Sequence, residues 1–572
     1  MALKLIMSIV FSSILVISTM IGAARSQAPV CHIPSQTEAA TKPARLLSGL
    51  GKVHISITTR SEKAQAFFDQ GLALLHSFWL YEADRSFAEA ARLDPQCAMA
   101  QWGIAMVGIN NTRRNEAIKQ AQALSSNVSP RERLYIAAVE ARYQGVRDRV
   151  QNNGFLGSTE AYRQALRHLV VLYPDDLEAK LFLALALISG YEDDGTPKAG
   201  TIEALALCRL VLAKEPNHPA AHHYLIHALE ASKRPQDAVL SADIYGSLVP
   251  NVGHAVHMPG HIYVHVNRWD DAAKVFEASA ALDRKYMREE RESSDHTAGP
   301  YSHNLHFLAT VYGYQGRYRD GIRVAQELLQ VATQSGEATS RAGLEGRMAM
   351  LRMLVRFEHW DDILDGNTLP DAGGFIVFNA WRHFALGLAH LGKGDAPAAR
   401  VELEMLEAET ARLKNEFPKQ TNAPQYGIQV RQTLALPVAL LELQGRIFAH
   451  EGKADEAIAL LGRALVAEIN VGYSEPPLYP HPMEEVLGQT LLELDRWAEA
   501  EKMFRAALER DSGSGRALFG LMQALRGEGQ DAGARQAYFQ LIRAWSRADS
   551  DLPETRRIKE LAATYADSAK GK

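Results

Sequence analysis

The stretch AVLSADIYGSLVPNVGHAVHMPGHIYVHVNRWDDA, residues 238–272, begins and ends on an alanine in the same sequence setting. Each alanine opens a segment whose apolar residues recur every three or four positions, which is the spacing of an amphipathic helix. Ala238 and Ala272 are 34 residues apart. A pair of helices repeated at this period predicts a solenoid, in which each unit buries its apolar face against the next one.

Other segments of the chain fit the same unit. They contain Phe87 with Ala90 and Pro95, Gly316-Arg317-Tyr318, Gly445 with Ala457, Trp497-Ala498-Glu499-Ala500, and Gly520 with Ala532. Small and aromatic residues at fixed places in a unit of about 34 residues are typical of tetratricopeptide (TPR) repeats. We therefore predict an all-α fold, a TPR-type α-solenoid in which helical hairpins stack into a right-handed superhelix.

Composition and period divide the chain into six segments. We predict a signal peptide at 1–28, a linker or N-terminal arm at 29–60, N-terminal TPR-like helices at 61–215, histidine-rich TPR units at 216–330, C-terminal TPR units at 331–550 and a polar tail at 551–572. Lys4, a mostly apolar run and Ser26-Gln27-Ala28 are typical of an export signal cleaved after Ala28. The alternative is an uncleaved anchor. We expect a periplasmic or secreted protein with no membrane span after cleavage.

Composition also argues against some classes of function. The formal net charge of the 572 residues is −5. Nucleic-acid binding requires a basic surface, so we expect no nucleic-acid partner. The three cysteines, Cys31, Cys97 and Cys208, form no CxxC pair. A thiolate zinc site is therefore not expected, at most one disulfide can form, and we predict that Cys208 is a buried thiol.

Histidines are concentrated between residues 218 and 306. Ala238, Ala272 and Gly321 can be placed at the same position of three successive repeat units. In this alignment, seven of the histidines fall at three equivalent positions of the first helix of each unit. The first position holds His254 and His303, the second His223, His257 and His306, and the third His227 and His261. These positions lie within about 60° of one another around a helix. In a TPR superhelix the first helices line the concave surface, so we predict that all seven side chains point into one groove.

Imidazole is a common metal ligand, and histidines four residues apart on a helix can hold one ion together. His223/His227 and His257/His261 are such pairs. Nitrogen and carboxylate ligands without thiolates suit copper, zinc or iron, and two three-histidine sets would suit a dicopper or di-iron centre. Two alternatives stay open. In one, the imidazoles of the groove bind the carboxylates of a peptide. In the other, duplication of the repeat has kept the histidines as hydrogen-bonding residues of the groove and nothing more.

A second group of residues is predicted to lie around the ligands or to line a substrate groove. It comprises His222, Glu230, Tyr263, His265, Glu475, Tyr479 and His481. Glu230 is expected to orient an imidazole. Glu475, Tyr479 and His481 precede a first helix and are expected to close over the groove, unless this Pro-rich stretch is only a turn. Pro259 predicts a kink between His257 and His261, or a tolerated irregularity.

Several segments resemble one family of exported bacterial TPR proteins. They are FFDQGL (67–72), CAMA (97–100), HHYLIHALEAS (222–232), HAVHMPGHIY (254–263), HNLHFL (303–308) and EPP (475–477). The resemblance extends over most of residues 60–510. It implies a TPR fold and a site built from these histidines, and it implies no particular substrate.

Two functions follow as hypotheses. The first is an exported TPR protein that binds a transition metal in its concave groove. If this protein is an enzyme, we expect a copper or iron oxidoreductase that acts on a small molecule or peptide. The second is a non-enzymatic TPR scaffold that binds a peptide or protein partner in the periplasm. No P-loop, dinucleotide fingerprint, GxSxG or HExxH motif is present, so the sequence supports no familiar hydrolase chemistry.

Overall fold

The computed structural model of the chain describes residues 42–144, 159–192, 194–297, 301–334, 341–371, 376–416 and 427–567. These residues form helices and connecting segments, and they contain no strand apart from an isolated bridge between Tyr191 and Pro197. None of the helices described is long and apolar enough to cross a membrane. The predicted signal peptide, its cleavage site and Cys31 lie outside the described residues.

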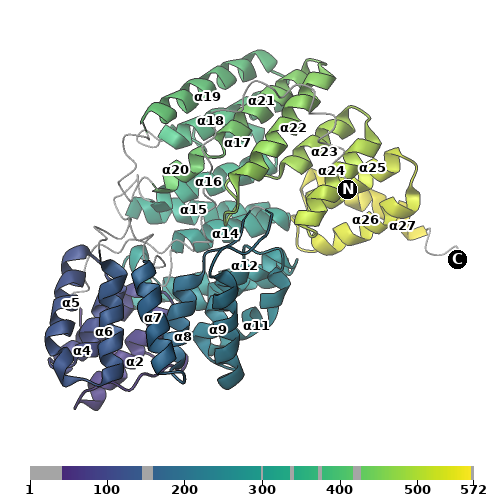
Figure 1. The fold of residues 1–572 in the computed structure, drawn as a ribbon. Coiled ribbons are helices and arrows are strands. Elements are labelled where there is room, and N and C mark those ends of the chain that lie inside the picture. The colour runs from purple at the N-terminus through teal and green to yellow at the C-terminus, as the bar shows by residue number, and fades with distance from the viewer. Residues whose placement is uncertain are drawn as a thin grey trace.

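Helices follow one another along the whole described chain (Figure 1). The N-terminal part contains α2 (Glu62–His76), α3 (Leu80–Leu93), α4 (Ala98–Val107), α5 (Asn111–Leu124), α6 (Pro130–Tyr143), α7 (Glu160–Leu172), α8 (Leu177–Leu187) and α9 (Thr201–Lys214). The histidine-rich part contains α10 (Pro219–Leu229), α11 (Val239–Leu248), α12 (Gly253–His265), α13 (Trp269–Glu290), α14 (Tyr301–Tyr314) and α15 (Tyr318–Gln334).

The C-terminal part contains α16 (Arg341–Arg356), α17 (Trp360–Leu364), α18 (Ile376–Gly392), α19 (Ala396–Glu416), α20 (Gly427–Thr433), α21 (Leu436–His450), α22 (Ala454–Val471), α23 (Met483–Glu493), α24 (Trp497–Arg510), α25 (Gly515–Gly527), α26 (Asp531–Ala544) and α27 (Pro553–Asp567). Short 3-10 turns occur at Ser125–Asn127, Pro235–Ala238 and Ser294–His296.

Consecutive helices pack against each other as hairpins, and the hairpins stack side by side (Figure 1). The predicted all-α, TPR-type solenoid is therefore confirmed. Ala238 and Ala272 are both fully buried, as expected of the small residue where two helices cross. Gly260 has the same role in α12, because a Cβ there would lie 2.3 Å from the ring of Phe276 on α13.

Segments near both ends of the described chain contact the histidine-rich units. At the C-terminal end, the indole of Trp545 donates to the carbonyl of Tyr314 at 2.9 Å. At the N-terminal end, the backbone N–H of Asn251 donates to the carbonyl of Gly49 at 3.3 Å. The histidine-rich units thus contact segments that lie far from them in sequence.

The structure differs from the sequence-based segmentation in two places. Residues 42–60 of the predicted linker or arm are irregular but docked, because Leu50 and Ile55 are buried. The predicted polar tail contains α27, whose Ile558 and Leu561 are buried. An apolar stripe in a mostly polar helix is enough to pack it against the solenoid. Residues 568–572 lie outside the described part of the chain.

The extra residues between the second and third histidine-rich units partly lengthen a helix. α13 has 22 residues, whereas the preceding 3-10 turn and α11 have 4 and 10. The inserted sequence therefore extends α13 by about two turns before the chain leaves it.

Candidate metal centre

The candidate site lies on three adjacent first helices, α10, α12 and α14. Pro219 begins α10 at a position where a helix needs no backbone donor. α12 continues as one helix through Pro259, so the predicted irregularity does not break the helix between His257 and His261. These three helices bring all seven predicted histidines into the interior, where each is at most 5% exposed.

The histidines form two sets of three. The N-terminal triad consists of His223, His227 and His254, and the C-terminal triad of His257, His261 and His303. Within each triad, one nitrogen from every imidazole lies within 4.8 Å of the others. The triads adjoin, since the ring centroids of His254 and His257 are 6.1 Å apart.

A simple rule of the repeat generates both triads. The second and third positions of one helix meet the first position of the next: His223 and His227 of α10 meet His254 of α12, and His257 and His261 of α12 meet His303 of α14. His306 occupies the second position of α14, but the third position there is Thr310. His306 is therefore buried without belonging to either triad, and its predicted place in the same ligand set is corrected.

Burial favours the uncharged form of six of the seven imidazoles. Burial lowers the pKa of His227 to about 3. Burial and neighbouring positive charges together lower five further pKa values well below the usual range, those of His223, His254, His257, His303 and His306. A neutral imidazole carries one lone pair that can bind a cation.

Hydrogen bonds at Nδ1 decide which nitrogen carries that lone pair. His223 Nδ1 lies 2.6 Å from the carbonyl oxygen of His76, which can only accept. His257 Nδ1 lies 2.7 Å from Asn304 Oδ1, and the amide of Asn304 is oriented because its Nδ2 donates to the carbonyl of Phe276 at 3.0 Å. Both neutral rings must therefore donate from Nδ1 and present a bare Nε2.

His261 is oriented in the same way by a carboxylate. Its Nδ1 contacts Glu475, and Glu230 lies 3.4 Å from the same nitrogen. The Nε2 atoms of His257 and His261 then face each other at 2.7 Å with no proton between them if both rings are neutral. Two lone pairs at this distance repel unless a cation lies between them. In the N-terminal triad, the bare Nε2 of His223 lies 3.2 Å from Nε2 of His254.

Two carboxylates complete the surroundings of His261. Glu230 also lies 3.2 Å from Nδ1 of His227, and burial raises the pKa of Glu230 to about 8. Glu475 also contacts His265 Nε2 at 2.8 Å. Burial raises the pKa of Glu475, but His261 and His265 more than offset this, so that its pKa falls below the usual value. Glu230, Glu475 and His265 thus lie where the sequence predicted.

The remaining predicted residues of the outer group point elsewhere. His222 contacts Ser241 and the carbonyl of Pro216, on the other side of α10. Tyr263 donates to Asp243. Tyr479 and His481 both contact Glu442 of α21 at 2.6 and 2.8 Å. The hydrogen bonds of these four side chains thus go to residues outside the triads, and their place in a substrate groove stays a prediction.

Phe78 and His76 cover the N-terminal triad, and the sequence reasoning missed both. Phe78 lies at the turn between α2 and α3 with φ of +56°. Its ring centroid is 4.5, 5.3 and 5.6 Å from those of His223, His227 and His254. The predicted groove is therefore filled at this point. Of α2 and the turn after it, the sequence singles out only the segment FFDQGL (67–72), which lies on α2 before this turn, and no spacing relates it to the histidines.

The two cysteines that the structure describes have no part in the site. Cys97 and Cys208 are buried free thiols, and burial raises the pKa of Cys208 to about 12. The predicted buried thiol at Cys208 is confirmed.

Comparisons with known proteins support the repeat. A tetratricopeptide repeat family model matches residues 486–553. No curated protein sequence matches the chain. Solved structures similar to it include a human IFIT1 dimer with m7Gppp-AAAA (12% identity, 85% of this chain and 96% of that one, TM-score 0.33) and the APC/C hetero-tetramer Cut9-Hcn1 (13%, 88% and 78%, TM-score 0.28). TM-scores this low carry no argument about function.

The matched repeat bears on the two hypotheses unequally. TPR repeats commonly present surfaces that bind peptides or proteins, so the match at residues 486–553 supports the scaffold hypothesis more directly than metal chemistry. The resemblance to exported bacterial TPR proteins stays a prediction.

Proposed function

We propose that this TPR protein binds two transition-metal ions, one in each histidine triad. The observation that carries the proposal is the Nε2–Nε2 distance of 2.7 Å between His257 and His261, whose Nδ1 atoms both face acceptors. A metal ion held between the two lone pairs would relieve their repulsion, and a nitrogen of His303 within 4.8 Å would supply a third ligand. Burial lowers the pKa of His257 well below its usual value, so this ring presents a lone pair and not a proton.

The ligands narrow the choice of metal. Each triad offers three neutral nitrogens and no thiolate, which suits copper, zinc or iron. Three protein ligands leave a coordination position for water or a substrate, as in catalytic metal sites. An oxidoreductase that uses copper or iron on a small molecule or peptide is the enzymatic form of the proposal, and oxygen uptake in the presence of candidate reductants tests it.

Elemental analysis of untagged protein purified after export tests metal binding itself. We expect two ions of copper, zinc or iron per chain, and we expect the His257→Ala/His261→Ala variant to lose one of them while its helical circular dichroism is unchanged. A wild-type protein that neither carries metal nor takes it up on reconstitution would refute the proposal. The matched control is His222→Ala, which removes an imidazole of α10 that faces away from the triads.

A second function, a protein-interaction scaffold, is favoured by the TPR repeat at residues 486–553. The two functions are compatible, since the histidine triads and this repeat occupy different parts of the chain. Affinity capture with and without a chelator separates them. A partner retained in the presence of chelator identifies a scaffold surface independent of the metal centre, whereas a partner lost with the metal links the two.

Export is proposed on the leader sequence, in which Ser26-Gln27-Ala28 follows an apolar run. N-terminal sequencing of the mature protein should begin at Pro29. A mature protein that begins at Met1 would contradict cleavage.

A further inference from the structure

The segment that carries Glu475 is held in place by α16. Residues 472–482, here called the strap, connect α22 to α23 without helical structure. A single guanidinium binds three of its carbonyl groups: Arg352 donates to Tyr479 at 2.8 Å, to Pro480 at 2.9 Å and also to Pro477. Arg352 thus fixes the backbone of the strap two to five residues beyond Glu475.

Arg352 is placed at a cost in stability. It is 5% exposed, and no carboxylate of the described residues forms an ion pair with it. Its Nε has no hydrogen-bond partner either, and burial lowers its pKa to about 10. A buried charge without an opposite charge is unfavourable. An apolar side chain would be more stable here if the only task were to fill the core.

The other end of this chain of contacts reaches the C-terminal triad. Glu475, whose side chain is 8% exposed, contacts Nδ1 of His261 and Nε2 of His265. Tyr479 and His481 anchor the strap again through Glu442. The strap therefore joins α16 and α21 to a ligand on α12.

We infer that Arg352 is a positioning residue for the metal centre, which acts on His261 through the strap and Glu475. This inference rests on the proposed metal function. Partners that orient a ligating histidine typically change metal affinity by about 10- to 100-fold. Loss of Arg352 frees the strap and releases Glu475 from His261, so it should weaken the C-terminal triad alone.

Cobalt(II) titration of the full-length exported protein tests the inference, because the visible spectrum of bound cobalt reports the geometry of the ligands. Arg352→Met keeps the volume and removes the buried charge. We expect roughly 10- to 100-fold weaker binding of the affected ion and the same spectral change as in Glu475→Gln. The Arg352→Met/Glu475→Gln double variant should show no further loss, because both changes break one path. Arg352→Lys keeps the charge and should restore part of the affinity.

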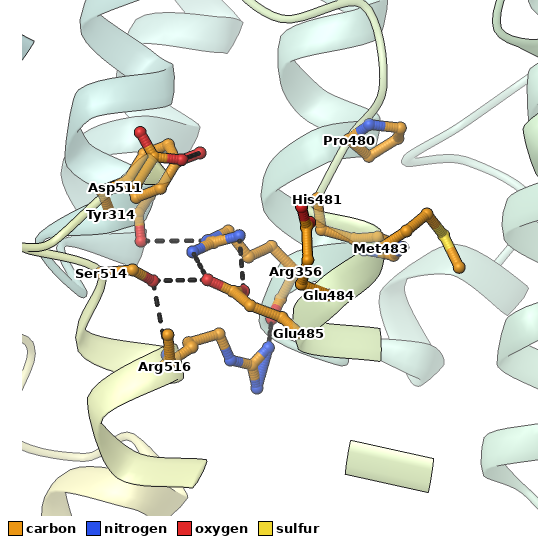
Figure 2. Close-up of polar contacts among 12 residues, drawn as sticks. Tyr314, Arg356, Pro480, His481, Met483, Glu484, Glu485, Asp511, Ser514 and Arg516 are labelled. Carbon is orange, nitrogen blue, oxygen red and sulfur yellow. Dashed lines mark hydrogen bonds and ion pairs between the residues drawn. The ribbon is translucent and has the colours of Figure 1, made fainter. Parts of the chain in front are cut away.

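Arg356→Lys is the matched control. Arg356 lies one turn further along α16 and is equally buried, but it pairs with Glu485 of α23 at 3.2 Å and not with the strap. Figure 2 shows this pair beside Ser514, with Pro480 and His481 at the end of the strap nearby. We expect the control to bind cobalt with wild-type affinity and spectrum.

Two results would overturn the inference while leaving the proposed function intact. One is wild-type cobalt affinity and spectrum in Arg352→Met. The other is an additive loss in the double variant, which would mean that Arg352 acts independently of Glu475. If Arg352→Met fails to fold, Arg352→Gln takes its place, and wild-type cobalt affinity and spectrum in that variant equally overturn the inference. Failure of wild-type protein to take up cobalt overturns the proposed function itself, and this inference with it.

Discussion

The two histidine triads are built by the same repeat rule but are supported differently. In the N-terminal triad, His223 donates to a neutral backbone carbonyl, and the ring of Phe78 covers all three imidazoles. Glu230 lies 3.2 Å from His227, but burial raises the pKa of Glu230 to about 8 and so favours its neutral form. In the C-terminal triad, His261 contacts the carboxylate of Glu475, supplied by a strap more than two hundred residues away in sequence. A carboxylate makes its imidazole a stronger ligand than a carbonyl does. We therefore expect the C-terminal triad to bind metal more tightly.

Removal of a ligand should give the largest effect. His223→Ala is expected to abolish the ion of the N-terminal triad and His257→Ala that of the C-terminal triad, so that each variant retains one ion and the double variant none. Metal analysis of the purified proteins gives the counts. If either single variant loses both ions, the triads form one indivisible site and the comparison fails.

Phe78→Ala should come next. Truncation of a buried phenylalanine typically costs about 3–5 kcal/mol, and here it also opens the N-terminal triad to water. We expect a lower melting temperature and faster loss of only one ion to a chelator. Phe307→Ala is the mirror variant, since Phe307 lies 5.3 Å from His261, and it should release the other ion. Identical release kinetics in the two variants would contradict separate covers.

Two buried carboxylates hold the supports of the triads and should lose their effect in acid. Glu178 contacts Nε2 of His76, beside the N-terminal triad, at 2.7 Å, and Glu442 holds the strap through Tyr479 and His481. Burial raises the pKa of Glu178, but His76 and His218 lower it to about 2, and His481, Arg446 and Tyr479 likewise bring Glu442 to about 2. Both values lie below the usual 4.5, so each carboxylate stabilises the folded state above pH 4.5 and loses this effect as the pH falls towards 2.

Each group should contribute about 3 kcal/mol of stability at neutral pH. Urea unfolding as a function of pH measures the loss. In Glu178→Gln or Glu442→Gln, the free energy of unfolding should fall less steeply as the pH drops below 4.5. An unchanged slope in both variants would show that other carboxylates control acid unfolding.

Glu475→Gln should have the smallest effect and the most selective one. A neutral amide is a weaker acceptor for His261, and we expect about 10- to 100-fold weaker binding, or about 1–3 kcal/mol, in the C-terminal triad. The N-terminal triad of the same molecule is the internal control in a competition titration with a chromophoric chelator. An equal loss of affinity in both triads would mean that Glu475 acts on the whole fold.

Much of this architecture could be predicted from the sequence. The helical period and the 34-residue spacing between Ala238 and Ala272 specify stacked hairpins, because helix formation and the choice of a buried face depend on residues three and four apart. The same period placed the seven histidines on first helices and on one side of them. Glu230 followed for the same reason, since it lies within one turn of His227.

Contacts between distant segments could not be predicted, because no period relates them. Local spacing does not show that the first position of one helix meets the second and third positions of the preceding one, and so it grouped His306 with the ligands. It also offered Glu475, Tyr479 and His481 as equals, whereas Glu475 contacts His261, and Tyr479 and His481 contact Glu442. Sequence thus determined the repeat and its histidine face. Tertiary packing decided which imidazoles meet, which tautomer each adopts and what covers them, because those depend on side chains brought together only by the curvature of the superhelix.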